Sequence, residues 1–297
     1  MVTIFRKAFY LIVYVPFYAV LKLMGSLPRE TSLKVGEAIG RIGYYIVGGR
    51  RRIARANVNL IYGDSLPEKA KEKIVRESFV TLGRLLADFS FFPRFNKGNI
   101  GSHVEYSGFE NYSRAIEQDK GLIYLCGHFG SWELMAFAHA VYGNPLCFVV
   151  RPADNPYIES LLLRYRELSG NRVISKWDAT KASLVSLKKG EAIGILLDQY
   201  VSADRGVVVP FLGKETGTST ITAALALRTD APVVPVFLLW DRTKRKHILR
   251  FDPSVEIKRN GDSTINIAEN TRRFNDILGD AIRKDPSLWL WCHRRWR

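Results

Sequence analysis

Two ionisable residues in the middle of the chain have the types and the spacing of an acid–base pair. His128 and Glu133 lie in the segment GHFGSWE, residues 127–133, which follows an apolar run. A histidine can take the proton of an alcohol near neutral pH, and a carboxylate on its far ring nitrogen would fix the tautomer and stabilise the imidazolium. The chemistry of these two residue types fits a dyad in which a histidine activates a hydroxyl group and a carboxylate orients the histidine ring.

The spacing of this pair restricts the backbone around it. On one continuous helix, side chains five residues apart would diverge by about 140°. The two side chains can therefore meet only if His128 lies in a turn after a strand and Glu133 lies in the first turns of the following helix. Backbone amides at such a helix start could stabilise an oxyanion. For the spacing alone, the favoured interpretation is a buried histidine with a satisfied hydrogen bond and a glutamate in a helix first turn.

The second two thirds of the chain alternate between two kinds of pattern. Short apolar runs predict strands, and amphipathic stretches between them predict helices. This alternation indicates an α/β fold with a mixed, partly parallel central sheet flanked by helices. The predicted strands are 122–126, 146–150, 192–197, 207–210, 233–239 and 247–251, and the predicted helices are 131–141, 156–169, 179–188, 219–228 and 265–283.

The N-terminal third has a different character. Residues 8–21 carry no charge, are rich in Tyr and Phe, and have Arg6, Lys7 and Lys22 beside them. Fourteen uncharged residues are fewer than the about 20 that cross a bilayer as a helix, so we expect an anchor that is shallow or tilted. An apolar helix packed on the core is the alternative. We divide the chain into a membrane anchor, 1–30, and one larger domain, 31–297, with a helical portion, 31–99, and an α/β core, 100–297.

Composition limits the class of partner. Lys and Arg number 44 against 29 Asp and Glu, a net charge of +15, which favours an anionic partner such as a phospholipid surface, an acidic carrier protein or nucleic acid. The hydrophobic fraction of 47% excludes a disordered chain. The three cysteines form no CxxC pair and the five histidines form no HExxH, so we expect no disulfide framework, no metal and no cofactor.

Besides the spacing of His128 and Glu133, several further segments of the chain resemble the motifs of one known family. The segment 127–133 resembles the His-x4-Asp/Glu motif of the late acyltransferases of lipid A (endotoxin) biosynthesis, within the glycerolipid acyltransferase superfamily. The similarity covers roughly residues 36–297. It departs at Val150, where Tyr is common in the family, and at Ser131, where Asn is frequent. The further matching segments are VRP at 150–152 with NP at 155–156, LDQ at 197–199, GVVVPFLG at 206–213 with Thr218, APVVP at 231–235 and WLWCHRRWR at 289–297.

The resemblance implies a role for individual residues. It implies that 31–297 is an acyltransferase domain in which His128 is the general base and Glu133 its orienting partner. Arg166 and Asp198 fall on positions where the family has functionally important residues, and Arg151 is implied as a phosphate or carrier contact. The other residues implied as substrate-binding or supporting are Gly206, Phe211 and Gly213.

The resemblance also implies the reaction. We expect an O-acyltransferase that moves a fatty acyl chain from an acyl thioester, acyl-acyl carrier protein, to a hydroxyl of an anionic lipid A precursor, at the cytoplasmic face of the inner membrane. Alternatives are another glycolipid or an amino-acid lipid as acceptor, acyl-CoA as donor, or hydrolysis with Ser131 as nucleophile, although Gly-x-Ser-x-Gly is absent. A non-enzymatic protein that binds membranes or nucleic acid is a further class. No nucleic-acid fold signature accompanies Trp289, Trp291 and Trp296, for which we expect packing or interface roles.

Overall fold

The central feature of the fold is a seven-stranded sheet, as the alternating pattern predicted. The computed structural model describes residues 2–175 and 179–297. The strand order is β1-β9-β8-β2-β5-β3-β4, and every neighbouring pair is parallel except the antiparallel β8 and β9. The sheet strands are β1 (Val104–Ser107), β2 (Leu122–Cys126), β3 (Leu146–Val150), β4 (Arg172–Ser175), β5 (Ala192–Leu196), β8 (Val233–Asp241) and β9 (Lys246–Phe251).

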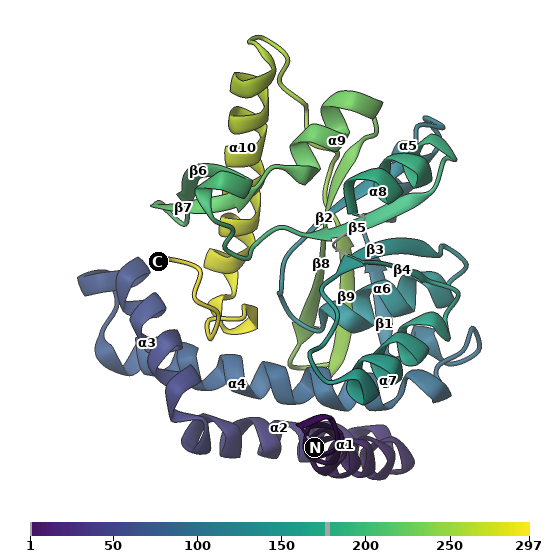
Figure 1. The fold of residues 1–297 in the computed structure, drawn as a ribbon, viewed down its shortest axis with the longest axis vertical. Helices are drawn as coiled ribbons and strands as arrows, with labels where there is room; N and C mark the ends of the chain where they lie inside the picture. The colour runs from purple at the N-terminus through teal and green to yellow at the C-terminus, as the bar shows by residue number, and fades with distance from the viewer. Residues whose placement is uncertain (1, 176–178) are drawn as a thin grey trace.

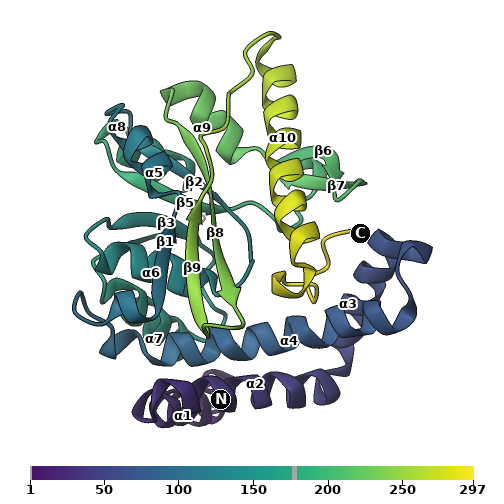
Figure 2. The same cartoon turned by 180° about the vertical axis from the view of Figure 1, so that it is seen from behind.

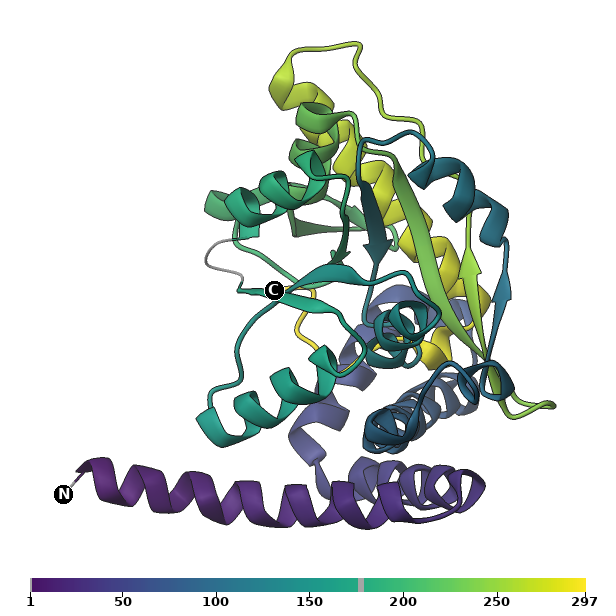
Figure 3. The same cartoon turned by 90° about the vertical axis from the view of Figure 1, so that its right-hand side faces the viewer.

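Helices cover both faces of this sheet (Figures 1 and 3). Successive residues of a strand point to opposite faces, and in β2 both sets are apolar and fully buried. Leu122, Tyr124 and Cys126 pack with α5, α6 and α7, whereas Ile123 and Leu125 pack with α8, α9 and α10. These helices are α5 (Phe109–Ile116), α6 (Trp132–Val141), α7 (Pro156–Glu167), α8 (Ala179–Lys188), α9 (Ile221–Thr229) and α10 (Ser263–Lys284).

Two predicted features differ in the structure. The run predicted as a strand at 207–210 is β6 (Gly206–Phe211), which pairs with β7 (Lys214–Ser219) in a separate antiparallel hairpin rather than in the main sheet. The elements β1, β4, β7 and α5 were not predicted. Strands β1 and β4 are the two edges of the sheet, with half-exposed and polar positions, so they lack the continuous apolar runs of central strands.

The N-terminal portion is helical, as expected, and packs tightly on itself. It comprises α1 (Val2–Ser26), α2 (Arg29–Ile46), α3 (Gly48–Tyr62) and α4 (Glu68–Ser90). Gly36 and Gly40 of α2 face α4 so closely that a Cβ on Gly36 would lie 2.3 Å from the carbonyl oxygen of Gly83. The absence of side chains at Gly36 and Gly40 therefore lets the two helix backbones touch.

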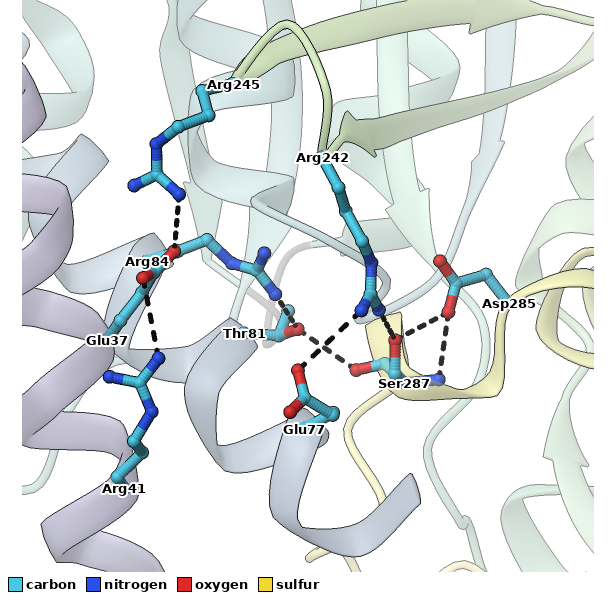
Figure 4. Close-up of polar contacts among 9 residues, drawn as sticks. All are labelled: Glu37, Arg41, Glu77, Thr81, Arg84, Arg242, Arg245, Asp285 and Ser287. Atoms are coloured by element: carbon cyan, nitrogen blue, oxygen red, sulfur yellow. Dashed lines mark hydrogen bonds and ion pairs between the residues drawn. The ribbon is translucent and has the colours of Figure 1, made fainter. Parts of the chain in front are cut away.

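Polar contacts join this helical portion to the α/β core (Figure 4). From the turn between β8 and β9, Arg245 reaches Glu37 of α2 at 3.4 Å, and Arg242 donates to the hydroxyl of Ser287 at 3.0 Å. Thr81 of α4 donates to the carbonyl of Ser287 at 3.0 Å. Helix α4, which runs along one end of the sheet in Figure 2, is thus bonded to the C-terminal segment that contains Ser287.

Helix α1 extends beyond the rest of the molecule (Figure 3). It continues through Lys22, so the helix is 25 residues long rather than limited to the uncharged run. The stretch Arg6–Ser26 is long and apolar enough to cross a membrane, and only 11% of its most apolar window is buried in the protein. Its exposed surface includes Ile12, 70% exposed, so α1 is not the core-packed helix considered as the alternative.

Candidate functional site

The order of the strands brings His128 and Asp198 together. Strands β2 and β5 are parallel neighbours, and Cys126 is paired with Leu196. Both strands end at the same edge of the sheet, so the residues two positions further along, His128 and Asp198, lie side by side. The turn after His128 depends on Gly130, which has a φ of +62° and would place a Cβ 2.0 Å from the carbonyl oxygen of Leu238.

The carboxylate of Asp198 holds both the backbone and the ring of His128. Its Oδ1 lies 2.8 Å from the ring Nδ1, and its Oδ2 accepts the backbone N–H of His128 at 2.8 Å. The side chain of Asp198 is 2% exposed and that of His128 is 15% exposed. This arrangement fixes the orientation of the imidazole and favours the tautomer in which Nδ1 carries the proton.

Asp198 is ionised although it is buried. Burial alone would raise the pKa of its carboxyl group. The charge of His128 and hydrogen bonds from His128 and the indole of Trp289 outweigh this effect and lower the pKa of Asp198 to about 2. The buried carboxylate therefore stays negative at physiological pH and can stabilise a positive imidazolium beside it.

The second ring nitrogen of His128 faces the solvent-accessible side of the site. With Nδ1 donating to Asp198, Nε2 carries the lone pair, and the side-chain amide of Gln199 lies 3.1 Å from it. The Trp132 ring packs edge-on against the imidazole, with 5.0 Å between ring centroids. Nε2 can therefore accept a proton from a hydroxyl group that enters between these side chains.

The structure corrects the expected partner of His128. Glu133 does not bond to the imidazole; its carboxylate accepts two hydrogen bonds from Arg166 of α7, at 2.9 and 2.6 Å. Glu133 is the second residue of α6 and its side chain points toward α7, whereas the end of β5 places Asp198 beside the ring. Arg166 is 11% exposed, and its pairing with Glu133 outweighs burial and raises the pKa of its guanidinium.

An apolar cavity lies between the sheet and α6. It encloses about 570 Å³, part of it open to solvent, and it is narrow. Its wall includes Trp132, which packs against the His128 imidazole, and Glu133. Phe148, whose ring centroid lies 6.0 Å from the Arg166 guanidinium carbon, also lines it. A narrow apolar cavity whose wall includes a side chain packed against an imidazole suits an extended alkyl chain.

The inner end of this cavity is aromatic. His139 lines it together with Tyr124 and Phe251. Both ring nitrogens of His139 are bonded to tyrosine hydroxyls, Nδ1 to Tyr106 at 2.7 Å and Nε2 to Tyr124 at 2.8 Å. Burial lowers the pKa of His139 to about 3. A neutral histidine with both nitrogens bonded is a satisfied structural group and closes the cavity.

The C-terminal segment completes the site, which the sequence did not predict. The indole N–H of Trp289 donates to Oδ2 of Asp198 at 2.6 Å, and the Leu290 N–H donates to the carbonyl of His128 at 3.1 Å. We had expected packing or interface roles for this tryptophan. Its apolar, aromatic neighbourhood in the sequence gives no signal for a hydrogen bond to a residue far along the chain.

The remaining predicted residues lie elsewhere. Arg151 is 66% exposed and pairs with Asp154 on the surface. Phe211 is fully buried, with its ring 4.6 Å from the Arg295 guanidinium carbon, and Gly213 is in the turn between β6 and β7. A Cβ on Gly206 would lie 2.2 Å from the carbonyl oxygen of Thr218. These three positions shape the hairpin next to the C-terminal segment, and none of them contacts the imidazole.

The structure also shows the surroundings of Ser131, of two cysteines and of the possible metal ligands. Ser131 is buried, and no hydrogen bond joins its hydroxyl to His128 in the described chain, so the structure forms no Ser131–His128 pair. Cys126 and Cys147 are buried, and burial raises the pKa of the Cys126 thiol. Within residues 2–175 and 179–297, no group of three or more His, Cys, Asp and Glu side chains has the arrangement of a metal site.

Known proteins resemble the chain over almost its whole length. Residues 3–297 match the family described as bacterial lipid A biosynthesis acyltransferase. A lipid A biosynthesis palmitoleoyltransferase of Escherichia coli (strain K12) is 25% identical over 279 residues, which are 94% of this chain and 89% of that protein. A lipid A biosynthesis acyltransferase of Haemophilus influenzae is 24% identical over 91% of this chain and 86% of its own length. A phosphatidylinositol mannoside acyltransferase of Mycolicibacterium smegmatis is 20% identical over 72% of this chain and 71% of its own length.

Proposed function

Because the chain belongs to the bacterial lipid A biosynthesis acyltransferase family and is therefore an O-acyltransferase, we propose that it transfers a fatty acyl chain from an acyl thioester to a hydroxyl of a lipid A precursor. The observation that carries this proposal is the partly buried His128–Asp198 pair, whose imidazole packs against Trp132 in the wall of a narrow apolar cavity. The pair supplies a base for the acceptor hydroxyl, and the cavity supplies a place for the alkyl chain.

The proposed reaction runs through Nε2 of His128. The acceptor hydroxyl takes the place of the Gln199 amide at Nε2, gives its proton to the imidazole, and attacks the thioester carbonyl carbon. The Asp198 carboxylate stabilises the imidazolium that forms. When the tetrahedral intermediate collapses, the carbon–sulfur bond breaks and the imidazolium returns its proton to the leaving thiolate, so the products are an ester and a free thiol.

Two further parts of the site act on the substrates. The first turn of α6, which begins at Trp132, presents backbone N–H groups that have no partner within the helix, and we assign them to the oxyanion. Glu133 lines the cavity and pairs with Arg166, and we assign this pair to positioning the substrates through the guanidinium. Glu133 thus contributes to catalysis through Arg166 rather than through the imidazole.

We propose acyl-acyl carrier protein as the donor and the cytoplasmic face of the inner membrane as the location. An acidic carrier is attracted by a chain with a net charge of +15, although acyl-CoA has the same thioester and also carries negative charge. The exposed, apolar α1 suits insertion into the bilayer that holds the lipid acceptor. The α/β domain then works at the surface where a water-soluble donor arrives.

The activity is tested with the purified protein and its His128→Ala variant, an acyl-acyl carrier protein and a phosphorylated disaccharide lipid. Wild-type protein should form an acylated lipid and free carrier thiol in equal amounts, and the variant should lose this activity by a factor of about 10³ or more. Acyl transfer by His128→Ala at near the wild-type rate would exclude the imidazole as the base.

The acceptor is tested in cells. Mass spectrometry of lipids from a strain that lacks the protein should show a lipid A species short of one acyl chain, restored by the wild-type gene and not by His128→Ala. Loss of a chain from another lipid instead, such as a mannosylated phosphoinositide, would keep the chemistry and change the acceptor. Comparison of rates with acyl-acyl carrier protein and acyl-CoA identifies the donor.

A further inference from the structure

A basic groove lies between the start of α3 and the C-terminal segment, outside the apolar cavity. In Figure 1 the chain end marked C lies close to α3. The groove encloses about 930 Å³, part of it open to solvent. Its lining residues, which we call the basic groove, are Val47, Gly49, Arg50, Ile53, His293, Arg294 and Arg297.

In the described part of the chain, the positive charges of the basic groove have no acidic partners. No ion pair there joins Arg50, Arg294 or Arg297 to a carboxylate, whereas Arg55, one turn further along α3, pairs with Glu72. Arg50 contacts a backbone carbonyl, and Arg297 packs over the ring of Tyr200. Like charges gathered in one groove repel each other, so an anion bound there would be stabilised.

Other polar groups of the groove also suit an anion. The first turn of α3 has no acidic residue, and Gly48 and Gly49 leave open space around the amides at this helix start. Arginine guanidiniums and helix-start amides are donors that bind phosphate.

Exposed apolar side chains border the basic groove. At the end of α2 and the junction with α3, Ile42 is 55% exposed, Tyr45 63%, Ile46 75% and Val47 45%. Water-exposed apolar residues beside unpaired arginines are typical of a surface that meets the interface of a membrane. The combination favours a phosphate carried by an amphiphile over a soluble anion or a nucleic acid.

Short connections join the groove to the reactive histidine. The Leu290 N–H bonds to the carbonyl of His128, and the groove residues 293–297 follow directly. Arg297 packs over Tyr200, whose neighbour Gln199 has its amide 3.1 Å from Nε2 of His128. A lipid whose hydroxyl lies at His128 would therefore have its remaining headgroup next to the groove.

We propose that the basic groove binds a phosphate group of a membrane amphiphile, namely a phosphate on the sugar headgroup of the acyl acceptor. This inference rests on the proposed function for the identity of the acceptor. The phosphate contacts Arg294 and Arg297 from the C-terminal segment and Arg50 with the helix-start amides from α3. The site thereby selects phosphorylated acceptors by binding them more tightly.

The test uses the full chain with the double change Arg294→Gln and Arg297→Gln. The matched control is Arg114→Gln with Arg228→Gln, which removes the same charge from arginines in the last turns of α5 and α9. One arm measures kcat and KM for a phosphorylated disaccharide lipid in detergent and for the same lipid after its phosphates are removed. The other arm measures cosedimentation with vesicles of phosphatidylcholine alone or with phosphatidylglycerol.

We expect the double change to raise KM for the phosphorylated lipid by about 30-fold, since each basic residue near an anionic surface contributes about fivefold. The kcat, the KM for the dephosphorylated lipid and the control variant should stay within about twofold of wild type. If KM is unchanged but binding to phosphatidylglycerol vesicles falls by a similar factor, the phosphate comes from the bilayer, and the assignment to the acceptor headgroup is overturned. A rise in KM for the acyl carrier alone would reassign the groove to the donor and overturn the proposal. The proposal would also be overturned if the double variant behaved like the control variant in both the kinetic and the vesicle-binding measurements. Failure of wild-type protein to transfer acyl groups would instead refute the proposed function. The cosedimentation measurement would then still show whether the groove binds phosphate-bearing lipids.

Discussion

The role of Asp198 leads to the sharpest prediction. Replacement by Asn keeps the shape of the side chain but puts an amide where one carboxylate oxygen was. Oδ2 accepts two hydrogen bonds, from the His128 backbone N–H and from Trp289, so the oxygen of the introduced amide should stay there. The new NH2 group then faces Nδ1, which must become an acceptor, and the ring proton moves to Nε2.

The size of the effect follows from these contacts. The hydrogen bond between Nδ1 and a charged acceptor contributes about 1.5–3 kcal/mol, a factor of roughly 10 to 150. Moving the proton to Nε2 also removes the lone pair that accepts the proton of the substrate, and the same change in a serine protease lowers kcat by about 10⁴-fold. We expect kcat of Asp198→Asn to fall by about 10³–10⁴-fold, with KM within a few-fold of wild type.

The assay combines steady-state kinetics with ¹⁵N NMR of labelled histidine, which reports the protonated ring nitrogen. Wild type should show His128 protonated at Nδ1, and Asp198→Asn should show it protonated at Nε2. The comparison variant is Glu133→Gln, which loses activity through the released Arg166 guanidinium but should keep the wild-type tautomer. A kcat for Asp198→Asn within tenfold of wild type, or a tautomer change in Glu133→Gln, would refute the assignment.

Two further predictions concern the cavity and its inner end. Ala136→Leu places a larger side chain in the cavity and should shift the preferred acyl chain by about two methylenes toward shorter chains. The transfer rate should fall about fourfold for each methylene that no longer fits. Competition between acyl donors of different length measures this shift, and Val185→Leu, at an exposed position, is the control. The folded pKa of His139, about 3, is below the about 6.5 of an unfolded histidine, so its contribution to stability is lost as pH falls below 6.5, by about 2 kcal/mol at pH 5. We expect the Tm in detergent to fall between pH 7.5 and pH 5 in both wild type and His139→Gln. The fall should be about 4 °C smaller in His139→Gln, because this variant has no buried imidazole to protonate. Equal falls in Tm would contradict the assignment of His139 as a buried neutral histidine.

Sequence reasoning predicted the central sheet better than its edges. The buried runs at 122–126 and 192–197 are apolar on both faces, and they form β2 and β5. The edge strands β1 and β4, Val104–Ser107 and Arg172–Ser175, were missed because pairing on one side only permits polar and exposed side chains. The order of the strands could not be deduced, since it depends on packing between elements far apart in the sequence.

The same missing information explains why the expected and the observed partner of His128 differ. His128 and Asp198 were both singled out, but Glu133 was assigned to the imidazole because it is close in sequence. Only the adjacency of β2 and β5 brings Asp198 to Nδ1, and only the fold brings Trp289 to Asp198. Local spacing predicts which side chains can react; the choice between two available carboxylates depends on tertiary structure.

The bond between Trp289 and Asp198 also has a consequence for how the protein is made. A ribosome synthesises His128 and Asp198 long before the indole that holds the carboxylate, and the Leu288 carbonyl that accepts the Gly130 N–H is equally late. Before these later residues dock, the carboxylate beside the imidazole lacks the indole N–H that holds it in place. The geometry of the His128–Asp198 pair is therefore complete only when the segment that carries Leu288 and Trp289 has docked against it.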